Sequence, residues 1–309
     1  MKNALVVTSD NNVEMGYTRT QFKRALSERG YNVLHFDLGY GSVSDRAVIK
    51  SAAPELAILC SSFALRNDEL YVQNRSLLKR LKCTFVNDLQ AHIEASNKCV
   101  SVNRILSSDL PFMKTVVTNF NGAPRNSLGR VDYSNVSLDV LDEDIERLGG
   151  FPLVYKKIYG SMGMQVHLVN SKVELKEILI QHEVFPSFIL QEYAKSAEFA
   201  MLCVRVIGDE AYPRFMLGSY LEEVNFKSVI AQGRLQLPCA LTDEIRDVAL
   251  GATSLLGVDT ARVDMFITDD GIKLCEVNSP GTILPTDQSY NMNVADQVVE
   301  LAIRKLGQQ

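Results

Sequence analysis

The chain has 309 residues, of which 46% are hydrophobic and 22% are charged, a composition typical of a globular protein large enough for two or three subdomains. Its 32 basic and 37 acidic residues give a net charge of −5, which leaves no net positive field to attract nucleic acid and no polybasic block to hold a membrane surface. The opening apolar run, residues 4–7, is too short for a signal peptide, and no later run approaches the roughly 20 residues of a spanning helix, so we expect a cytoplasmic protein without nucleic-acid or membrane partners.

Residues 1–86 alternate apolar runs with amphipathic segments. Thr18 and Gln21 form a capping box, which predicts that a helix over residues 19–29 begins there. Repeated β–α–β units build a parallel sheet with helices on its faces, so we expect a Rossmann-like domain. No Gly-x-Gly-x-x-Gly motif follows the first strand, so a dinucleotide is not indicated, and residues 8–12 form either a surface turn or a loop that touches a substrate. The apolar runs that predict the strands are residues 4–8, 31–36, 56–60 and 83–86.

Residues 87–187 read as a second unit. A helix expected over residues 97–107 has Lys98 in its first turn. The stretch 120–135 is rich in Asn, Gly, Ser and Arg and forms either a plain insertion or a flap over a binding site. The sequence leaves both readings of that stretch open.

A strand over residues 151–156 ends at Lys156 and leads into a glycine-rich segment, Gly160-Ser161-Met162-Gly163. Small residues there would let backbone N–H groups approach phosphate oxygens, and the lysine would supply the countercharge. A Gly-Ser turn between two strands, preceded by an exposed lysine, explains the same pattern. Lys157 stands beside Lys156, and strand alternation favours Lys156 for the inward position.

The strongest pattern lies in the last unit, residues 188–309. Two strands flank a turn at Asp269-Asp270-Gly271, and counting outward from Asp270 places Asp264 opposite Glu276. The period of two puts both acids on one face together with Phe266 and Leu274. The other face is then expected to be apolar and buried, with Val263, Met265, Ile267, Cys275 and Val277.

Opposed carboxylates repel unless a positive charge lies between them. Asn278, two residues after Glu276, adds a neutral oxygen on the same side. Such oxygen ligands favour Mg²⁺, and hydrated Mg²⁺ sites typically join a protein to substrate phosphates. The alternative is an acidic hairpin that faces solvent. The apolar residues expected beside the acids, Phe266 and Leu274, argue against it.

In this order along the chain, the segments resemble the ATP-grasp superfamily, and within it the RimK-like branch of carboxylate–amine ligases, with glutathione synthetase and D-alanine:D-alanine ligase as more distant relatives. The resemblance covers nearly the whole chain and implies a mixed α/β and α+β fold. A Rossmann-like pre-ATP-grasp domain would span residues 1–86, a first lobe with the glycine loop residues 87–187, and a second lobe with the metal site residues 188–309. Four segments support it: residues 151–166, 190–195, 206–210, and Val263-Asp264-Met265 followed by Glu276-Val277-Asn278-Ser279-Pro280-Gly281.

The resemblance implies ATP and two Mg²⁺ ions as cofactors, with Mn²⁺ as an alternative metal. Asp264, Glu276 and Asn278 would hold the metals, with Glu276 bridging them. The spacing of Glu198 from Gln191 matches the D-alanine ligase pattern better than the RimK-like one. The implied ATP ligands are Lys98 and Lys156 on the phosphates, Gly160, Ser161, Met162 and Gly163 over the triphosphate, Gln191 with the backbone of Glu192, Tyr193 and Ala194 at the adenine, and Glu198 on the ribose.

The implied activity is ATP-dependent formation of an amide or peptide bond. A substrate carboxylate would attack the γ-phosphate to give an acyl phosphate, and an amine would then displace phosphate. The substrates would be small-molecule or peptide carboxylates and amines. The resemblance leaves open whether the chain forms a homo-oligomer. Phosphoryl transfer needs position and positive charge more than covalent catalysis, which suits lysines, metals and N–H groups, and a closed glycine loop would exclude water from the acyl phosphate.

The chain departs from the family pattern at three places. Met201-Leu202-Cys203 stands where RimK-like enzymes have Asp-x-Arg, Lys227-Ser228-Val229 replaces Arg-Ser-Asn, and Gln165 replaces the third loop glycine. Because the family arginine faces the reacting carboxylate, we expect Arg205 to take its place as the catalytic cation, with Lys227 and Arg262 behind it. The lost arginine also supports an alternative, a nucleotide-binding scaffold without ligase activity, whereas the retained metal trio, hinge and lysines favour an enzyme.

Overall fold

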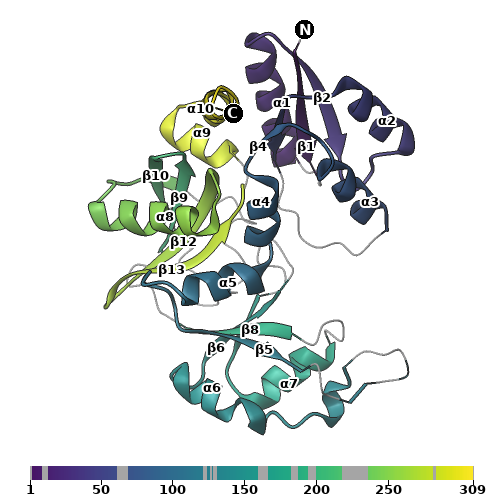
Figure 1. Ribbon diagram of the computed structural model, residues 1–309. Helices are drawn as coiled ribbons and strands as arrows, with labels where there is room; N and C mark the ends of the chain where they lie inside the picture. Colours follow the sequence, from purple (N-terminus) through teal and green to yellow (C-terminus); the bar gives the residue numbers. More distant parts are fainter. Residues whose placement is uncertain are drawn as a thin grey trace.

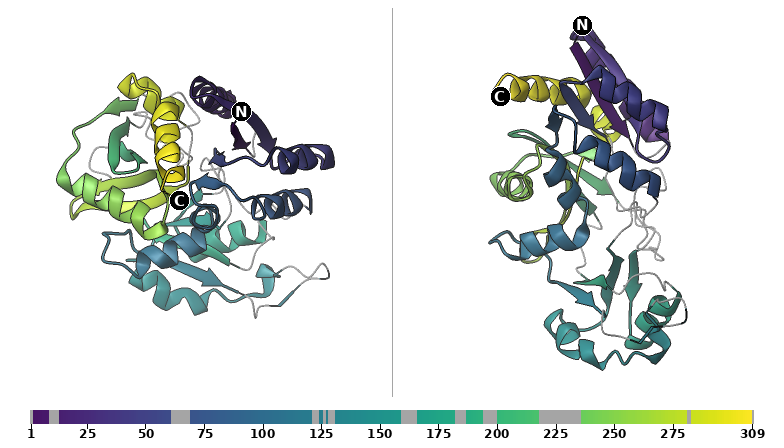
Figure 2. Two further views of the ribbon diagram at one scale, coloured as in Figure 1. Left: turned by 45° about the horizontal axis from the view of Figure 1, so that its top comes forward. Right: turned by 45° about the vertical axis from the view of Figure 1, so that its right-hand side comes forward.

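Three β-sheets form the computed structural model, which describes residues 2–8, 13–60, 69–120, 124–125, 127, 131–158, 166–181, 187–193, 200–217, 236–280 and 283–308. The sheets succeed one another along the molecule, with the N-terminal sheet and both chain ends at the top and the sheet of β5, β6 and β8 at the bottom (Figures 1 and 2). Across these ranges, none of the helices combines the length and the apolar character that crossing a bilayer requires.

The N-terminal sheet is parallel, with the strand order β2–β1–β3–β4, as the sequence predicts. Alternate residues of β1 enter two different cores: Ala4 and Val6 pack towards α1, whereas Leu5 and Val7 pack towards α2. Burial on both faces is typical of a parallel sheet between helices. The elements are β1 (Lys2–Thr8), α1 (Val13–Glu28), β2 (Tyr31–Asp37), α2 (Val43–Ala52), β3 (Leu56–Leu59), α3 (Glu69–Leu78) and β4 (Thr84–Val86).

Helix α1 begins at Val13 and not after Thr18, so the capping-box prediction is wrong. Thr18 is buried inside the helix, with 1% of its surface exposed. The first turn is instead held by Met15, which packs with Phe22 into the core beneath the helix. Burial of this additional apolar residue favours the longer helix over a start at the polar pair.

The sheet of the first lobe is antiparallel, with the order β5–β8–β6–β7. Because β8 pairs with β5 and β6 on its two sides, we propose that the first lobe extends to Glu192 and does not end at residue 187. The elements are β5 (Thr115–Asn119), the 3₁₀ turns η1 (Tyr133–Asn135) and η2 (Asp139–Leu141), α6 (Asp142–Arg147), β6 (Leu153–Lys157), β7 (Val166–Val169), α7 (Lys172–Gln181) and β8 (Ser187–Glu192).

The sheet of the second lobe is also antiparallel, with the order β11–β10–β9–β12–β13. Helix α8 covers it and runs from a Thr242 cap to Gly257, whose φ of 70° closes the helix in the left-handed conformation. Helices α4 (Leu89–Ala95) and α5 (Lys98–Leu106), which the sequence-based division assigns to the first lobe, pack through Ala95 and Ile105 into the core beneath α8, so we propose that they belong with the second lobe. The other elements are β9 (Ala200–Ile207), β10 (Glu210–Leu217), β11 (Gln236–Pro238), α8 (Asp243–Leu256), β12 (Thr260–Thr268), β13 (Gly271–Asn278), α9 (Leu284–Tyr290) and α10 (Val294–Leu306).

A β-bulge in the β12–β13 hairpin changes which side chains share a face with the acids. Asp264 does lie opposite Glu276, as predicted, but Met265 pairs with Leu274, so Cys275 is the extra residue. Leu274 packs into the α8 core, whereas the Cys275 sulfur lies 3.3 Å from Lys156 Nζ. The sequence-based assignment of Leu274 to the acid face and Cys275 to the core is therefore wrong, because a regular period of two does not allow for an inserted residue.

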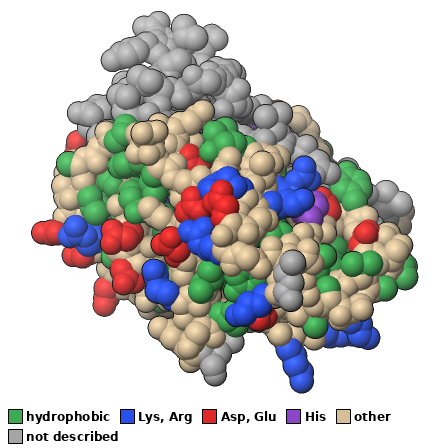
Figure 3. All heavy atoms as spheres, turned by 90° about the horizontal axis from the view of Figure 1, so that it is seen from above, with side chains coloured by type: hydrophobic (Ala, Val, Ile, Leu, Met, Phe, Trp, Pro, Cys, Tyr) green, Lys and Arg blue, Asp and Glu red, His purple; other side chains and the backbone are tan. Residues whose placement is uncertain are grey.

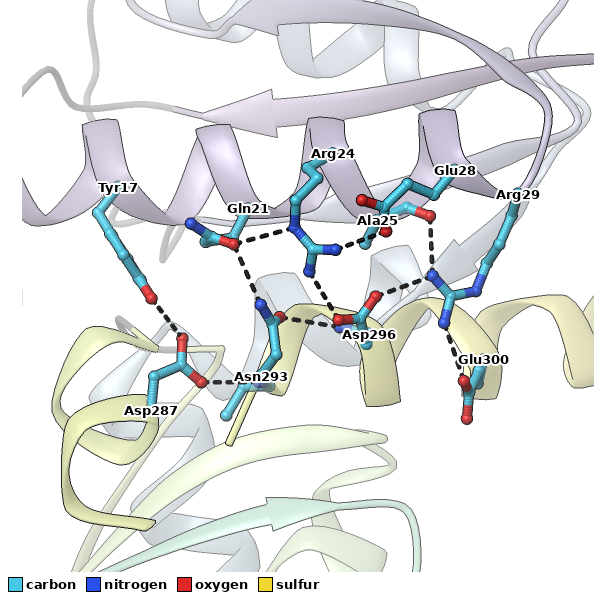
Figure 4. Close-up of polar contacts among 11 residues, drawn as sticks. Tyr17, Gln21, Arg24, Ala25, Glu28, Arg29, Asp287, Asn293, Asp296 and Glu300 are labelled. Carbon is cyan, nitrogen blue, oxygen red and sulfur yellow. Dashed lines mark hydrogen bonds and ion pairs between the residues drawn. The ribbon is translucent and has the colours of Figure 1, made fainter. Parts of the chain in front are cut away.

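The C-terminal helix α10 packs against α1 of the N-terminal domain, and ion pairs join the two helices (Figure 4). Asp296 accepts from Arg24 Nη2 at 2.6 Å and from Arg29 Nη1 at 2.9 Å, and Arg29 Nη2 reaches Glu300 at 2.8 Å. Seen from above, acidic and basic side chains adjoin one another on this end of the molecule (Figure 3). Beside the ion pairs, Phe22 and other apolar residues of α1 share one core with those of α10.

We expect Asp296→Asn to lower the free energy of unfolding by about 1 kcal/mol at neutral pH. Partial burial would raise the pKa of Asp296, but hydrogen bonds from Arg24 and Arg29 lower it below its ordinary value. A depressed carboxyl pKa stabilises the fold above the unfolded pKa, near 3.9, and this contribution is lost as the pH falls through the folded value. Urea denaturation should therefore show the difference at pH 7 and a smaller one near pH 3.

Glu300→Gln is the matched control, since its side chain is 57% exposed and pairs with Arg29 alone. It should cost less than the Asp296 change. Equal stability of wild type and Asp296→Asn at pH 7 would contradict the assigned role.

Candidate active site

A pocket lies where helix α5, the first-lobe sheet and strand β13 meet. Lys98 comes from α5, Lys156 from β6 and Gln191 from β8, and β13 adds Glu276 and Asn278. Three separate parts of the chain thus bring polar side chains of both signs into one space. Of the residues expected at the site, these five line the pocket together.

Lys98 is the first residue of α5 and directly follows the residue that caps this helix, Asn97. The Asn97 side chain caps the helix by accepting the N–H of Cys99 at 3.0 Å. A lysine in a first turn is disfavoured by the helix dipole. Its Nζ lies 3.8 Å from Glu276 Oε2, so a carboxylate on a different element offsets this cost.

Lys156 is almost fully buried, with 8% of its surface exposed, and its Nζ donates to Cys275 Sγ at 3.3 Å. Burial alone would lower its pKa, but the neighbouring Cys275 and Glu276 raise it above the ordinary value. The ammonium group therefore stays charged at neutral pH. Lys156 lines the pocket, in agreement with the strand alternation. Burial lowers the pKa of its neighbour Lys157.

The end of β8 is anchored to the segment before β5. Gln191, 2% exposed, donates from Nε2 to Thr115 Oγ1 at 2.9 Å. Glu192 accepts the N–H of Lys114 at 2.9 Å and lies 3.5 Å from Lys273 Nζ. Its own N–H donates to the Lys114 carbonyl, so any contact of the Glu192 backbone with a ligand would use its carbonyl group. Tyr193, the next residue, is half-buried.

The three expected metal ligands form one hydrogen-bonded cluster. Asp264 is 1% exposed, and its Oδ2 accepts from Arg262 Nη2 at 2.7 Å and from Asn278 Nδ2 at 2.9 Å. Asn278 Nδ2 also donates to Glu276 Oε1 at 3.0 Å. One amide group therefore joins the two carboxylates.

Charged neighbours keep Glu276 ionised. Burial would raise the pKa of Glu276, but Lys98 and Lys156 lower it to about 2. Burial raises the pKa of Asp264, and Arg262 opposes that rise. The charged form of Glu276 is thus strongly stabilised, whereas the charge of Asp264 depends on Arg262.

The donor set fits a hard divalent cation such as Mg²⁺. Asp264 Oδ1 is buried and has no hydrogen-bond partner of ordinary geometry, although the Cys203 thiol on β9 lies on the same face. Asn278 directs its amide nitrogen to the acids, and a half-turn of the amide brings its oxygen to the same place. Within the described ranges no cluster of three His, Cys, Asp or Glu side chains exists, and the expected third ligand, Asn278, is an amide.

Beyond Asp264, the same face of the sheet carries two further buried arginines. Arg205, on β9 opposite Arg262, is 1% exposed and donates from Nη1 to the Pro280 carbonyl oxygen. Burial and the charges of Arg214 and Arg262 lower the pKa of Arg205 to about 9. Arg205 is therefore already engaged with the segment that follows the expected metal ligands.

Arg214, on β10, is the residue that sequence reasoning missed. It is 1% exposed and lies directly opposite Cys203. The turn at Gly208-Asp209 could have revealed this position, because pairing Ile207 with Glu210 fixes the register that sets residue 214 against residue 203.

The remaining expected site residues lie outside the ranges that the structure describes. They are Gly160, Ser161, Met162 and Gly163 of the glycine loop, Ala194, Glu198 and Lys227.

A buried polar network holds the end of β13 in place, and no sequence motif announces it. Asn87 donates to the Thr260 carbonyl at 2.8 Å and to Ser279 Oγ at 2.6 Å, and its Oδ1 accepts the Thr260 N–H at 2.7 Å. His92 Nδ1 lies 3.0 Å from the same Ser279 hydroxyl. Since Ser279 follows Asn278 directly, the network fixes the backbone beside the expected metal ligands.

Asn87→Ala should lower the free energy of unfolding by about 2–4 kcal/mol, because it leaves the buried N–H and C=O of Thr260 without their partner. Asn135→Ala is the matched control: Asn135 is exposed and bonds Asp132 on the surface. Urea denaturation of both variants measures the difference. Equal losses in the two variants would show that the network does not support the fold.

The architecture is that of an ATP-grasp ligase fold, and solved structures show it. The crystal structure of D-alanine–D-alanine ligase from Bacillus anthracis matches 100% of this chain and 98% of that chain, with a TM-score of 0.70 and 15% sequence identity. The ATP-grasp ligase PsnB, solved with a minimal precursor, matches 98% of this chain and 99% of its own, with a TM-score of 0.67 and 15% identity. At this identity the likeness establishes the fold.

The chain belongs to the RimK-like ATP-grasp domain family, whose model matches residues 131–302, more than half of the chain. It is 27% identical over 235 residues to N-acetylaspartylglutamate synthase A of Mus musculus, covering 74% of this chain and 56% of that protein. It is 28% identical over 217 residues to tetrahydromethanopterin:alpha-L-glutamate ligase of Methanocaldococcus jannaschii, covering 68% and 67%. The chain thus spans little more than half the length of the mouse relative.

Proposed function

We propose that the protein is an ATP-dependent carboxylate–amine ligase that forms an amide or peptide bond and releases ADP and phosphate. The observation that supports this most directly is the pocket itself, where Lys98 and Lys156 approach the Asp264–Glu276–Asn278 cluster. Two lysines and a carboxylate pair fit the phosphate tail of a nucleotide with bound Mg²⁺. Membership of the RimK-like family agrees with this assignment.

In this proposal the two lysines hold the ATP phosphates. Gln191 and the segment after it adjoin the adenine. Asp264, Glu276 and Asn278 hold Mg²⁺, two ions in all, with Mn²⁺ as an alternative. Bound Mg²⁺ would neutralise phosphate charge and polarise the γ-phosphate. Lys98 and Lys156 orient the same phosphates and stabilise the charge that moves onto ADP.

The reaction has two steps. An oxygen of the substrate carboxylate attacks the γ-phosphorus, the bond to the ADP oxygen breaks, and an acyl phosphate forms. The amine then attacks the acyl carbon, phosphate leaves with the bonding electron pair, and the nitrogen loses a proton. Arg262, hydrogen-bonded to Asp264, is the described arginine fixed closest to the metal ligands and would stabilise negative charge on the reacting carboxyl group.

The names of the relatives guide the choice of substrates. Two of them are named for products or reactions that involve glutamate, and PsnB was solved with a precursor. We therefore place L-glutamate first among the amines to be tested. Small carboxylic acids and peptides are both to be tested as carboxylate substrates.

Purified protein with ATP and Mg²⁺ should release ADP and phosphate in equal amounts only when a carboxylate and an amine are both present. Pools of carboxylic acids, peptides and amino acids, followed by mass spectrometry of the product, identify the pair. Tight nucleotide binding without release from any pool would contradict the ligase proposal and support a nucleotide-binding scaffold, the alternative that Cys203 in place of arginine suggests.

Glu276→Gln should lower kcat roughly 100-fold or more and weaken the binding of Mg·ADP, because it removes the charge that faces both lysines. Isothermal titration with Mg·ADP provides a readout that does not depend on turnover. Asp270→Asn, in the exposed turn of the same hairpin, is the control and should behave as wild type. If the two variants bind Mg·ADP equally well, Glu276 is not a metal ligand.

A further inference from the structure

Two cross-strand rows on one face of the second-lobe sheet connect the metal ligands to the buried arginines. The first row runs Glu276, Asp264, Cys203, Arg214 from β13 to β10, each residue directly opposite the next. Adjacent strands lie about 4.8 Å apart. Arg214 therefore starts two strands beyond Asp264, on the side away from β13. The second row runs Asn278, Arg262, Arg205, Tyr212.

Cys203 gives the Arg214 side chain room to lie over it towards Asp264. A thiol is short, whereas an extended arginine spans more than one strand spacing. Asp264 and Arg262 lie on the same face of the sheet, two strands from Arg214, and their charges act on its guanidinium, as do Cys203 and Tyr290 of α9.

Arg214 is buried, with 1% of its surface exposed. Two of its three guanidinium nitrogens, Nε and Nη1, have no hydrogen-bond partner in the described part of the chain. Asp264, the carboxylate that acts on it, is hydrogen-bonded through Oδ2 to Arg262 and Asn278, and its Oδ1 is the oxygen left for Mg²⁺ in the proposed function. Burying a guanidinium in this way costs several kcal/mol. Burial and the nearby Arg262 both lower its pKa, which shows the same imbalance.

An anion from outside the chain would correct this imbalance. The lysines approach Glu276 from the α5 and β6 side, which is where the nucleotide phosphates belong in the proposed function. Arg214 lies on the other side of Asp264, on β10, two strands along the same row. A group held by Arg214 would therefore meet the phosphates across the metal ligands, which is where an attacking nucleophile must stand.

We propose that Arg214 binds the substrate carboxylate that becomes phosphorylated. The inference rests on the ligase function proposed above and adds a residue that recognises the substrate. A planar guanidinium matches a carboxylate in two parallel hydrogen bonds, and that pairing is strong when both groups are buried. Arg205, whose Nη1 is bound to the Pro280 carbonyl, positions the chain beside this site.

The test measures binding without turnover. Wild-type protein is first saturated with Mg·ADP, and acetate, succinate, glutarate, citrate and inorganic phosphate are then titrated in at constant ionic strength. We expect at least one carboxylate to bind. Arg214→Gln should raise the Kd of that carboxylate at least tenfold, while the Kd of Mg·ADP changes less than twofold. Arg246→Gln is the control, since Arg246 is exposed on α8 and pairs with Asp243 alone among the described residues, and it should leave both affinities unchanged.

Arg214→Lys keeps the charge but not the planar fork. It should raise the Kd of the carboxylate at least threefold. If Arg214→Gln does not fold, this variant is used in its place. Once the substrates are known, Arg214→Lys should raise the KM for the carboxylate at least tenfold and the KM for ATP less than twofold. A variant defective only in folding would not separate these two constants.

Three results would overturn the inference: carboxylate affinity unchanged in the Arg214 variants, binding of phosphate but of no carboxylate, or binding of Mg·ADP with none of the probes. Failure of the wild type to bind Mg·ADP would instead reject the ligase proposal and this inference with it. The nucleotide titration thus separates the two failures.

Discussion

The structure depends on the charge balance around two carboxylates, Asp264 and Glu276, that face each other across a hairpin. Left alone they would repel each other in a buried place. Arg262 compensates Asp264, and Lys98 and Lys156 compensate Glu276. Because the lysines come from a helix and from the first-lobe sheet, the same attraction that keeps the acids ionised also determines how these parts of the chain meet.

Sequence reasoning succeeded where a pattern depends on neighbours along one strand or helix. The parallel N-terminal sheet and the opposition of Asp264 and Glu276 are such cases. It failed where one residue departs from a regular repeat. The bulge at Cys275 exchanged the faces of Leu274 and Cys275, and burial of Met15 moved the start of α1 away from Thr18.

Other features could not be predicted because they join distant parts of the chain. Asn87 and Thr260, which share two hydrogen bonds, are 173 residues apart, and nothing local marks Asn87 as buried. Arg214 enters the candidate site through the register between β10 and β9, and its significance comes from Cys203, Asp264 and Arg262 around it. An isolated arginine on a strand is ordinarily interpreted as a surface residue.

The position of α10 has a consequence for the order of events during protein synthesis. Val298 and Val299 of this helix complete the core formed by Ala4, Val6 and Phe22 at the opposite end of the chain. The first domain therefore leaves the ribosome with one apolar face uncovered, and that face waits until the whole ATP-grasp region has been translated. A chaperone that covers α1 and β1 until α10 is made would protect an apolar surface of the nascent chain.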